Sequence, residues 1–210
     1  MRLFILRENI KRYQNLLERE QSDATRETLL QLLAAAQAEL ADVERASTHR
    51  FSRNDDLVKA AAEATLDNVV EVQHAQFASL HFHDVSAGVL VIMAQRNLPH
   101  AFLDRFGSVS AGDGSSYGRC LATGNGVRIE DVLEDPLFEP YRDIARSTGF
   151  RAMQSTPLRD WKGNLLVVLT TLFAATHRFT AGECAAMDRE AVRLAPTFDQ
   201  LLRNARTAPP

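Results

Sequence analysis

The chain has 210 residues, of which 45% are hydrophobic and 24% charged, and its formal net charge is −3. A chain of this length and composition can bury one substantial core without metal ions or disulfides. The slightly acidic balance argues against a surface that grips nucleic acid. Cys120 and Cys184 lie far apart with no C-x-x-C spacing, which argues against a disulfide framework and a thiolate metal site and favours a reducing compartment.

The apolar runs are short. The run at residues 3–6 is too short for a signal peptide, and the longest stretch, residues 165–175, is too short to span a bilayer and suits a buried strand. We therefore expect a cytoplasmic protein that binds neither nucleic acid nor a membrane.

Apolar residues recur in steps of three and four in two N-terminal segments, which is typical of two amphipathic helices. The two apolar stripes are Leu3, Leu6, Ile10, Tyr13 and Leu17, and then Leu29, Leu33, Ala36, Leu40 and Val43. The break at residues 21–23 can cap the second helix, so residues 1–45 are predicted to form a helical hairpin. Because neither helix can bury its stripe alone, the hairpin must pack on itself, on a second chain as a dimerising arm, or on the next domain. A polar linker is predicted at 46–54.

Residues 55–204 show the pattern of one α+β domain. A helix with apolar residues from Val58 to Val72 precedes a hairpin of period-two strands near 77–83 and 89–94. Later elements are predicted as a short helix after 99, strands at 108–110, 127–130, 150–158 and 165–173, helices at 115–124 and 141–148, and a last helix from 184 to 201. Pro196 should kink that last helix, and the tail 205–210 is expected to be disordered.

Several blocks in this region resemble bacterial GAF domains in order and spacing. The blocks are AQRNLP at 94–99, GDGS at 112–115, LATG at 121–124, IEDV at 129–132, DPLF at 135–138 and GFRAMQSTPL at 149–158, and the match ends near RFT at 178–180. The resemblance implies a sheet of about six antiparallel strands with flanking helices. It also implies a small-molecule pocket on one face of the sheet, and terminal helices that pair in dimers and signal to an output domain.

From the resemblance we expect the pocket to be lined by Tyr117, Phe138, Tyr141, Met153 and Ser155, because aromatic walls with a few polar groups suit a small organic ligand. The sequence departs from the family pattern at three positions. Val167 replaces a usual glycine, Tyr117 stands where cysteine or alanine is common, and Cys120 replaces a common alanine. The ligand and any cofactor are left unassigned by these residues.

Catalytic and metal-binding interpretations compete with structural ones at three places. Some GAF-type proteins reduce free methionine sulfoxide with a cysteine near Tyr117, but here Cys120 lies one helical turn later without a nearby resolving cysteine. His81 and His83 share a strand face and could bind a metal or haem, yet no spacing supplies a third ligand, so a solvent-facing pair is expected. Asp131, Glu134 and Asp135 are expected to cap and turn the chain. We therefore predict no enzyme and no metal site.

The leading functional hypothesis is a sensory module in which a small ligand shifts the terminal helices between two arrangements. A ligand-free dimerisation and relay module is the alternative, and a methionine sulfoxide reductase is the third. No kinase motif is present in the chain, so a controlled histidine kinase or other output domain would lie outside it. The last helix ends where such a domain would begin in a longer sensor, and a homodimer through the terminal helices is expected.

Overall fold

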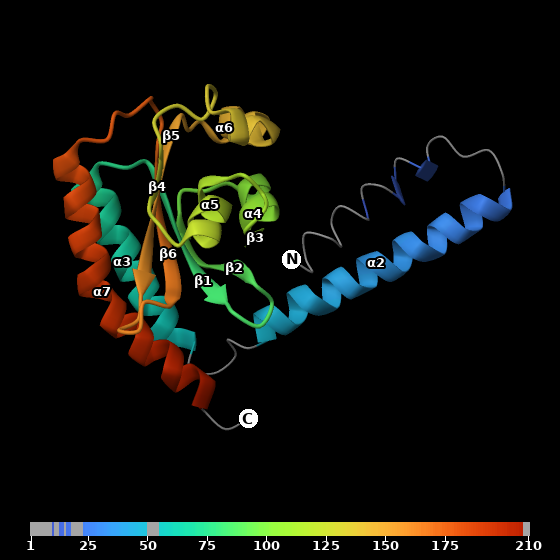
Figure 1. Cartoon of the computed structure of the whole chain (residues 1–210), viewed down its shortest axis with the longest axis horizontal. Helices are drawn as coiled ribbons and strands as arrows, with labels where there is room; N and C mark the ends of the chain where they lie inside the picture. The colour runs from blue at the N-terminus through green and yellow to red at the C-terminus, as the bar shows by residue number, and fades with distance from the viewer. Residues whose placement is uncertain (1–9, 11–12, 15, 18–22, 50–54, 208–210) are drawn as a thin grey trace.

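The computed structural model describes residues 10, 13–14, 16–17, 23–49 and 55–207 (Figure 1). The helices are α2 (Asp23–His49), α3 (Asp55–Gln73), α4 (His100–Phe106), α5 (Ser116–Thr123), the 3-10 helix η1 (Pro136–Tyr141), α6 (Arg142–Thr148) and α7 (Ala181–Thr207). The strands are β1 (Phe77–Asp84), β2 (Val89–Arg96), β3 (Ser108–Ser110), β4 (Val127–Ile129), β5 (Ala152–Arg159) and β6 (Leu165–Phe173).

The strands form one six-stranded sheet in the order β3-β2-β1-β6-β5-β4, and every pair is antiparallel. This confirms the predicted α+β fold with a sheet of about six strands. The two hairpins, β1–β2 and β5–β6, meet at the centre, where Leu80 of β1 lies opposite Leu169 of β6. Their alternating side chains supply apolar groups to both faces of the sheet, so both faces can bury a core.

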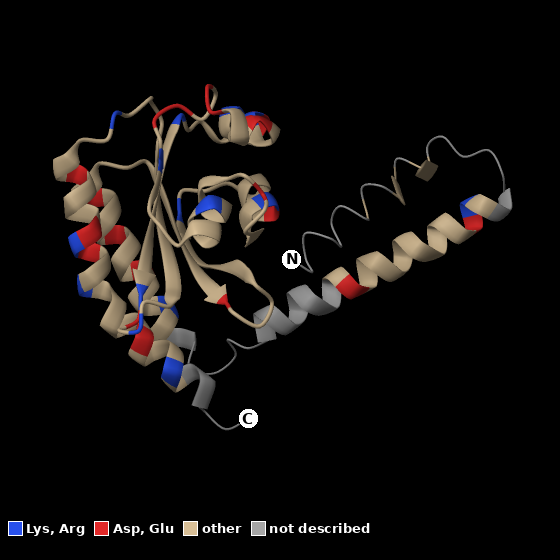
Figure 2. Ribbon diagram, in the orientation of Figure 1, with Lys and Arg blue, Asp and Glu red and all other residues tan. Residues whose placement is uncertain are grey.

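Helices α3 and α7 cover one face of the sheet, and α4, α5 and α6 lie over the other (Figure 1). The first face buries Leu80, Leu158 and Leu169 of the sheet together with Leu66 of α3 and Phe198 of α7. The second face carries a separate aromatic cluster, described below. Figure 2 shows that acidic and basic residues are interspersed along the outer surfaces of α3 and α7.

The N-terminal segment extends away from the sheet as α2 (Figure 1). Arg26 of α2 donates a hydrogen bond from Nη1 to the carbonyl of Leu17 at 2.8 Å. Leu29, Leu33 and Leu40 are partly buried, as the predicted stripe requires. The hairpin boundaries remain predictions: α2 continues to His49, four residues into the expected linker, and residues 50–54 lie outside the described part of the chain.

The last helix is longer than predicted, since it continues to Thr207, three residues into the tail expected to be disordered. It is one helix through Pro196, and the kink there stays a prediction. Proline removes one backbone hydrogen bond but its ring is compatible with helical φ, so tertiary packing can carry a helix past it. Residues 208–210 are outside the described part of the chain.

Candidate ligand-binding site

Phe106, the last residue of α4, is the centre of an aromatic cluster on the second face of the sheet. Its ring centroid lies 5.7 Å from that of Tyr117, 6.4 Å from Phe138 and 5.2 Å from Tyr141. Phe138 in turn contacts Tyr141 at 5.4 Å and Phe150 at 6.0 Å, both edge to face, which is a favoured geometry for aromatic pairs. Three predicted pocket residues are therefore brought together by a residue that the sequence pattern does not single out.

A chain of buried hydroxyl groups lies on the sheet beneath these rings. The Ser155 hydroxyl of β5 hydrogen bonds with those of Ser116 and Thr170, each at 2.8 Å. The Tyr117 hydroxyl hydrogen bonds with that of Ser79 at 2.8 Å. Burial raises the pKa of Tyr117 above its usual value, and the hydrogen bond with Ser79 opposes the rise, so the phenol is neutral.

His81 extends this polar group on β1. Its Nε2 bonds to the carbonyl of Phe106 at 2.8 Å, and its ring centroid lies 4.5 Å from that of Tyr117. Burial lowers the pKa of His81 to about 4, so the ring is neutral near pH 7, Nε2 donates, and Nδ1 is left as an acceptor. Nδ1 is buried and has no hydrogen-bond partner among the described residues.

The expectation of a solvent-facing histidine pair is therefore wrong for His81, which is fully buried. The alternation along β1 places the side chain of His81 on the opposite face of the sheet from Leu80. Helices α4 and α5 cover the face that carries His81, so this side chain is not exposed to solvent. His83 is only partly buried, and its Nδ1 lies 3.2 Å from the carbonyl of Leu165.

Tyr141 closes one side of the cluster. Its hydroxyl donates to the carbonyl of Asp113 at 2.5 Å and accepts from Arg105 at 2.6 Å. The Arg105 guanidinium carbon also lies 4.4 Å from the Tyr141 ring centroid, a cation–π distance. These contacts tie the loop before α5 to α4 and η1, which form the outer cover of the site.

All five predicted residues lie on this face, but the space between them is filled by side chains. Tyr117, Phe138, Met153 and Ser155 are completely buried and Tyr141 nearly so. Met153 belongs to the same buried cluster and lies opposite Ile129 of β4. Sequence reasoning misses Phe106, Arg105, Ser79, Ser116 and Thr170 as site residues. Only Ser79 carries a signal, because it shares strand parity with His81.

The carboxylates near η1 have structural partners. Asp135 caps η1 by accepting from the backbone N–H groups of Leu137 and Phe138, and it forms a two-point ion pair with Arg119 at 3.0 Å. Asp131 accepts from the backbone of Leu133 and pairs with Arg151, whose guanidinium holds the pKa of Asp131 below its usual value. These contacts support the predicted capping role.

A family model for the GAF domain matches residues 55–191, which is more than half of the chain. The chain belongs to the GAF domain family. No curated protein is significantly similar in sequence.

Solved structures similar to this GAF domain come from regulatory proteins and from enzymes. A domain assigned to a two-component sensor histidine kinase from Sinorhizobium meliloti is 20% identical, with a TM-score of 0.59, covering 72% of this chain and 98% of that one. The GAF domain of a phosphoenolpyruvate-protein phosphotransferase from Coxiella burnetii is 18% identical, with a TM-score of 0.61 and coverage of 79% and 95%. Free methionine-R-sulfoxide reductase from Neisseria meningitidis is 19% identical, with a TM-score of 0.57 and coverage of 75% and 86%. At these identities the likeness establishes the fold.

Cys120 of this GAF domain is poorly suited to act as a nucleophile. The side chain is fully buried, and burial raises the pKa of its thiol to about 12, so the reactive thiolate is scarce near pH 7. Tyr117 lies one turn earlier on α5 and is equally buried.

The described residues bear on metal and membrane binding as well. Within these residues, no three His, Cys, Asp or Glu side chains gather as metal ligands would. None of the described helices has both the length and the apolar character needed to cross a bilayer.

Proposed function

We propose that this GAF domain is a small-molecule-sensing regulatory module, without catalytic activity, whose ligand binds among Tyr117, Phe138, Tyr141, Met153 and Ser155. GAF domains are typically sensing or regulatory modules of signalling proteins. The observation that carries the proposal is the set of buried, hydrogen-bonded hydroxyl groups of Ser155, Thr170 and Tyr117 beneath an aromatic cover. Apolar walls with a few convergent polar groups are the usual composition of a small-ligand site.

Because the site residues are buried, ligand entry requires the cover of α4, α5 and η1 to move outward. A ligand that binds the open arrangement better shifts the population toward it. The Nδ1 acceptor of His81 and the hydroxyls of Tyr117 and Ser155 can then bond to the ligand instead of to one another. This chemistry favours a compact organic molecule with at least one hydrogen-bond donor.

Contacts of Arg159 and Arg128 link α5 and β4 to neighbouring elements, and the one made by Arg128 reaches the terminal helix α7. Arg159 donates to the carbonyl of Gly124 at the end of α5, and through Nη1 to the carbonyl of Gly163 at 2.8 Å. Arg128 of β4 lies 3.6 Å from Asp188 of α7. The proposal is that movement of α5 and β4 reaches α7 through the Arg128–Asp188 pair. From α7 it passes to an output domain, such as a histidine kinase, or to a partner, in a cytoplasmic homodimer that pairs through its terminal helices.

Native mass spectrometry of the purified 210-residue chain tests the sensing proposal. We expect a discrete extra mass that denaturation releases and that can be identified. Rebinding of the released compound should weaken about tenfold on Ser155→Ala or Tyr117→Phe, the effect of one hydrogen bond. Ser147→Ala removes an equivalent hydroxyl from exposed α6 and should leave affinity unchanged. Unchanged affinity after Tyr117→Ala and Met153→Ala would place the ligand elsewhere.

A ligand-free dimerisation and relay module is the second candidate, and the complete burial of Tyr117 and Met153 favours it. If this second candidate is right, native mass spectrometry should show no bound ligand, and the signal is passed on by the association of two chains alone.

A further inference from the structure

Four polar side chains lie together on the face of the sheet that α7 covers. Arg128 of β4 is directly opposite Gln154 of β5, and Gln154 is directly opposite Thr171 of β6. Thr156 follows Gln154 on the same face of β5. Side chains that face one another on neighbouring strands have Cβ atoms about 4.5–5.5 Å apart, so these neighbours are within contact reach. We call the four residues the polar row.

Each member of the polar row has a buried polar atom without a hydrogen-bond partner among the described residues. These atoms are Nε of Arg128, Nε2 of Gln154, and Oγ1 of Thr156 and Thr171. Gln154, Thr156 and Thr171 are at most 1% exposed. All four groups can donate a hydrogen bond. Because an unpaired buried donor is costly, a cluster of four points to a bound acceptor.

Arg128 is paired with an acidic residue of α7, and the contact is loose. Its Nη2 lies 3.6 Å from a carboxylate oxygen of Asp188, whereas charge-assisted hydrogen bonds of this kind are about 2.7–2.9 Å long. The Asp188 side chain is 61% exposed, so it can turn to water. The edge of the guanidinium that carries Nε and Nη2 can then bind another carboxylate at two points, the arrangement that arginine favours.

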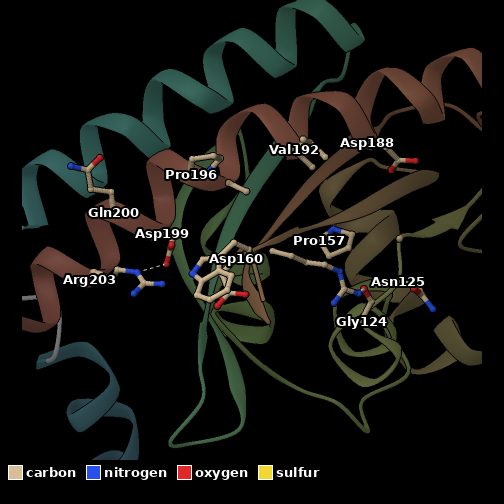
Figure 3. A pocket seen from close by; sticks show the side chains of 15 residues that line it. Gly124, Asn125, Pro157, Asp160, Asp188, Val192, Pro196, Asp199, Gln200 and Arg203 are labelled. Carbon is tan, nitrogen blue, oxygen red and sulfur yellow. Dashed lines mark hydrogen bonds and ion pairs between the residues drawn. The ribbon is translucent and has the colours of Figure 1, made fainter. Parts of the chain in front are cut away.

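The Arg128 guanidinium lies at the end of a groove that runs along α7. Asp188 and Gly126 both line this groove, and a Cβ at Gly126 would lie 3.6 Å from Nη1 of Arg128. Figure 3 shows Asp188 at one end of the groove and Arg203 toward the other, with Val192 between them. The groove volume of about 700 Å³ is within the range of small-ligand pockets, about 300–1,000 Å³.

The groove is apolar between its charged ends. Val192 of α7 is 74% exposed, and Trp161, in the turn after β5, is 79% exposed. The ring of Pro196 lines the same space. At the far end, Arg203 is already bonded to Asp199 at 2.8 Å. The groove therefore matches a molecule that has an apolar body and a carboxylate at the Arg128 end.

We propose that the groove and the polar row form a second binding site, which takes a small carboxylic acid with an apolar tail. The carboxylate accepts hydrogen bonds from Nε and Nη2 of Arg128 and from the side-chain amide of Gln154. The tail lies along α7 against Val192 and Trp161. The acid takes the place of Asp188 on Arg128.

Displacement of Asp188 has a consequence for α7. The Arg128–Asp188 pair is the contact through which β4 reaches α7 in the proposed function, so the acid breaks that route. Amide hydrogen exchange in α7 should therefore rise when the acid binds. This consequence rests on the proposed function, whereas binding of the acid does not. Unchanged exchange in a chain that binds the acid would separate the site from the signalling route.

Nuclear magnetic resonance of the isotope-labelled 210-residue chain tests the proposal, with sodium octanoate as the probe. The Nε–H signal of Arg128 and the side-chain amide signal of Gln154 should shift and saturate. Sodium acetate lacks the tail and octanol lacks the carboxylate, so each should bind at least about tenfold more weakly. From butyrate to octanoate, the affinity should rise about twofold to fourfold for each added methylene group.

Matched variants test the two ends of the site. Arg128→Gln and Val192→Glu should each lower the octanoate affinity at least about tenfold. Arg203→Gln removes the guanidinium at the other end of the same groove, and Val72→Glu changes an exposed valine of α3 outside it, so both should leave the affinity unchanged. Asp188→Asn should raise the affinity, because it removes the competing carboxylate. Melting curves establish that each variant is folded.

Four outcomes would overturn the proposal. If octanoate causes no saturable shift at Arg128, the polar row is satisfied by buried water and not by an acid. Equal affinity for octanoate and octanol would show that the carboxylate is not recognised. A loss of affinity on Arg203→Gln but not on Arg128→Gln would contradict the placement of the carboxylate, and a loss on Tyr117→Phe would place the acid in the aromatic site. Because octanoate is added and followed at Arg128, the sensing proposal is judged separately by the bound mass.

Discussion

His81 combines full burial with a single hydrogen bond. Its ring rests on Tyr117, its Nε2 is bonded to the carbonyl of Phe106, and burial lowers its pKa to about 4. An unfolded histidine has a pKa of about 6.5, so at intermediate pH the unfolded chain binds the proton and the folded chain does not. The stability that His81 contributes is therefore complete above about pH 6.5 and is lost as the pH falls toward 4.

Replacing His81 should remove this pH dependence. Between pH 7 and pH 5 we expect the wild-type chain to lose about 2 kcal/mol of unfolding free energy through His81 alone. His81→Gln keeps an N–H donor for Phe106 and does not titrate, so its loss over the same range should be smaller by that amount. Urea denaturation at both pH values measures the difference. The same substitution at His83 is the control, and an equal effect there would contradict the assignment.

At the scale of elements, α5 shows how local sequence fixes a helix. Ser115 caps its start by accepting from the backbone N–H of Gly118, and Gly124 ends it in the left-handed region at φ 69°. Both positions are predictable, because serine and glycine are the residues that these two ends favour. The carbonyl of Gly124 also accepts from Arg159, so the end of the helix is tied to the β5–β6 turn.

Gly124→Ala should therefore cost more than the backbone strain alone. A Cβ there would lie 2.7 Å from Nη2 of Arg159, so the guanidinium would have to move. Gly149 ends α6 at φ 87°, and a Cβ at that position would meet no atom within 4 Å, so this glycine isolates the strain. We expect Gly149→Ala to lower the unfolding free energy by about 1 kcal/mol and Gly124→Ala by about 2 kcal/mol, measured by urea denaturation. Equal losses would show that the Arg159 contact contributes nothing.

The difference between local sequence signals and packing between distant segments explains how much of this structure the sequence can predict. Strand alternation, helix caps and turn glycines are local, so the sequence places β1 to β6 and α5 within a few residues. The candidate site depends on which helices cover which face, and that is decided by packing between distant segments. This is why the sequence pattern wrongly predicts that His81 faces solvent and does not single out Phe106. Nothing near either residue in the sequence indicates that α4 lies over β1.

For the whole molecule, the buried threonine hydroxyls of β5 and β6 are hydrogen bonded on one face of the sheet and unpartnered on the other, within the described residues. On the aromatic face, the Thr170 hydroxyl is bonded to Ser155 at 2.8 Å. On the face under α3 and α7, Thr156 and Thr171 are buried but their hydroxyls have no hydrogen-bond partner among the described residues. Gln154, which lies opposite Thr171, has an unpartnered side-chain nitrogen within the same described part of the chain. A buried polar group without a partner is destabilising. The packing of α3 and α7 on the sheet is therefore less stable than their apolar contacts alone would make it.

Two adjacent threonines of β6 turn this difference into a test. Thr171→Val keeps the shape and removes an unpartnered hydroxyl, so it should raise the unfolding free energy by about 1 kcal/mol. Thr170→Val makes the same change on the other face and breaks a hydrogen bond, so it should lower it by a similar amount. Amide hydrogen exchange should slow in α7 for Thr171→Val, because the substitution stabilises the packed position of α7 relative to the locally opened state from which exchange occurs. If Thr171→Val destabilises the chain or leaves exchange in α7 unchanged, this layer is not the weaker one, and the route for signals through α7 loses its support.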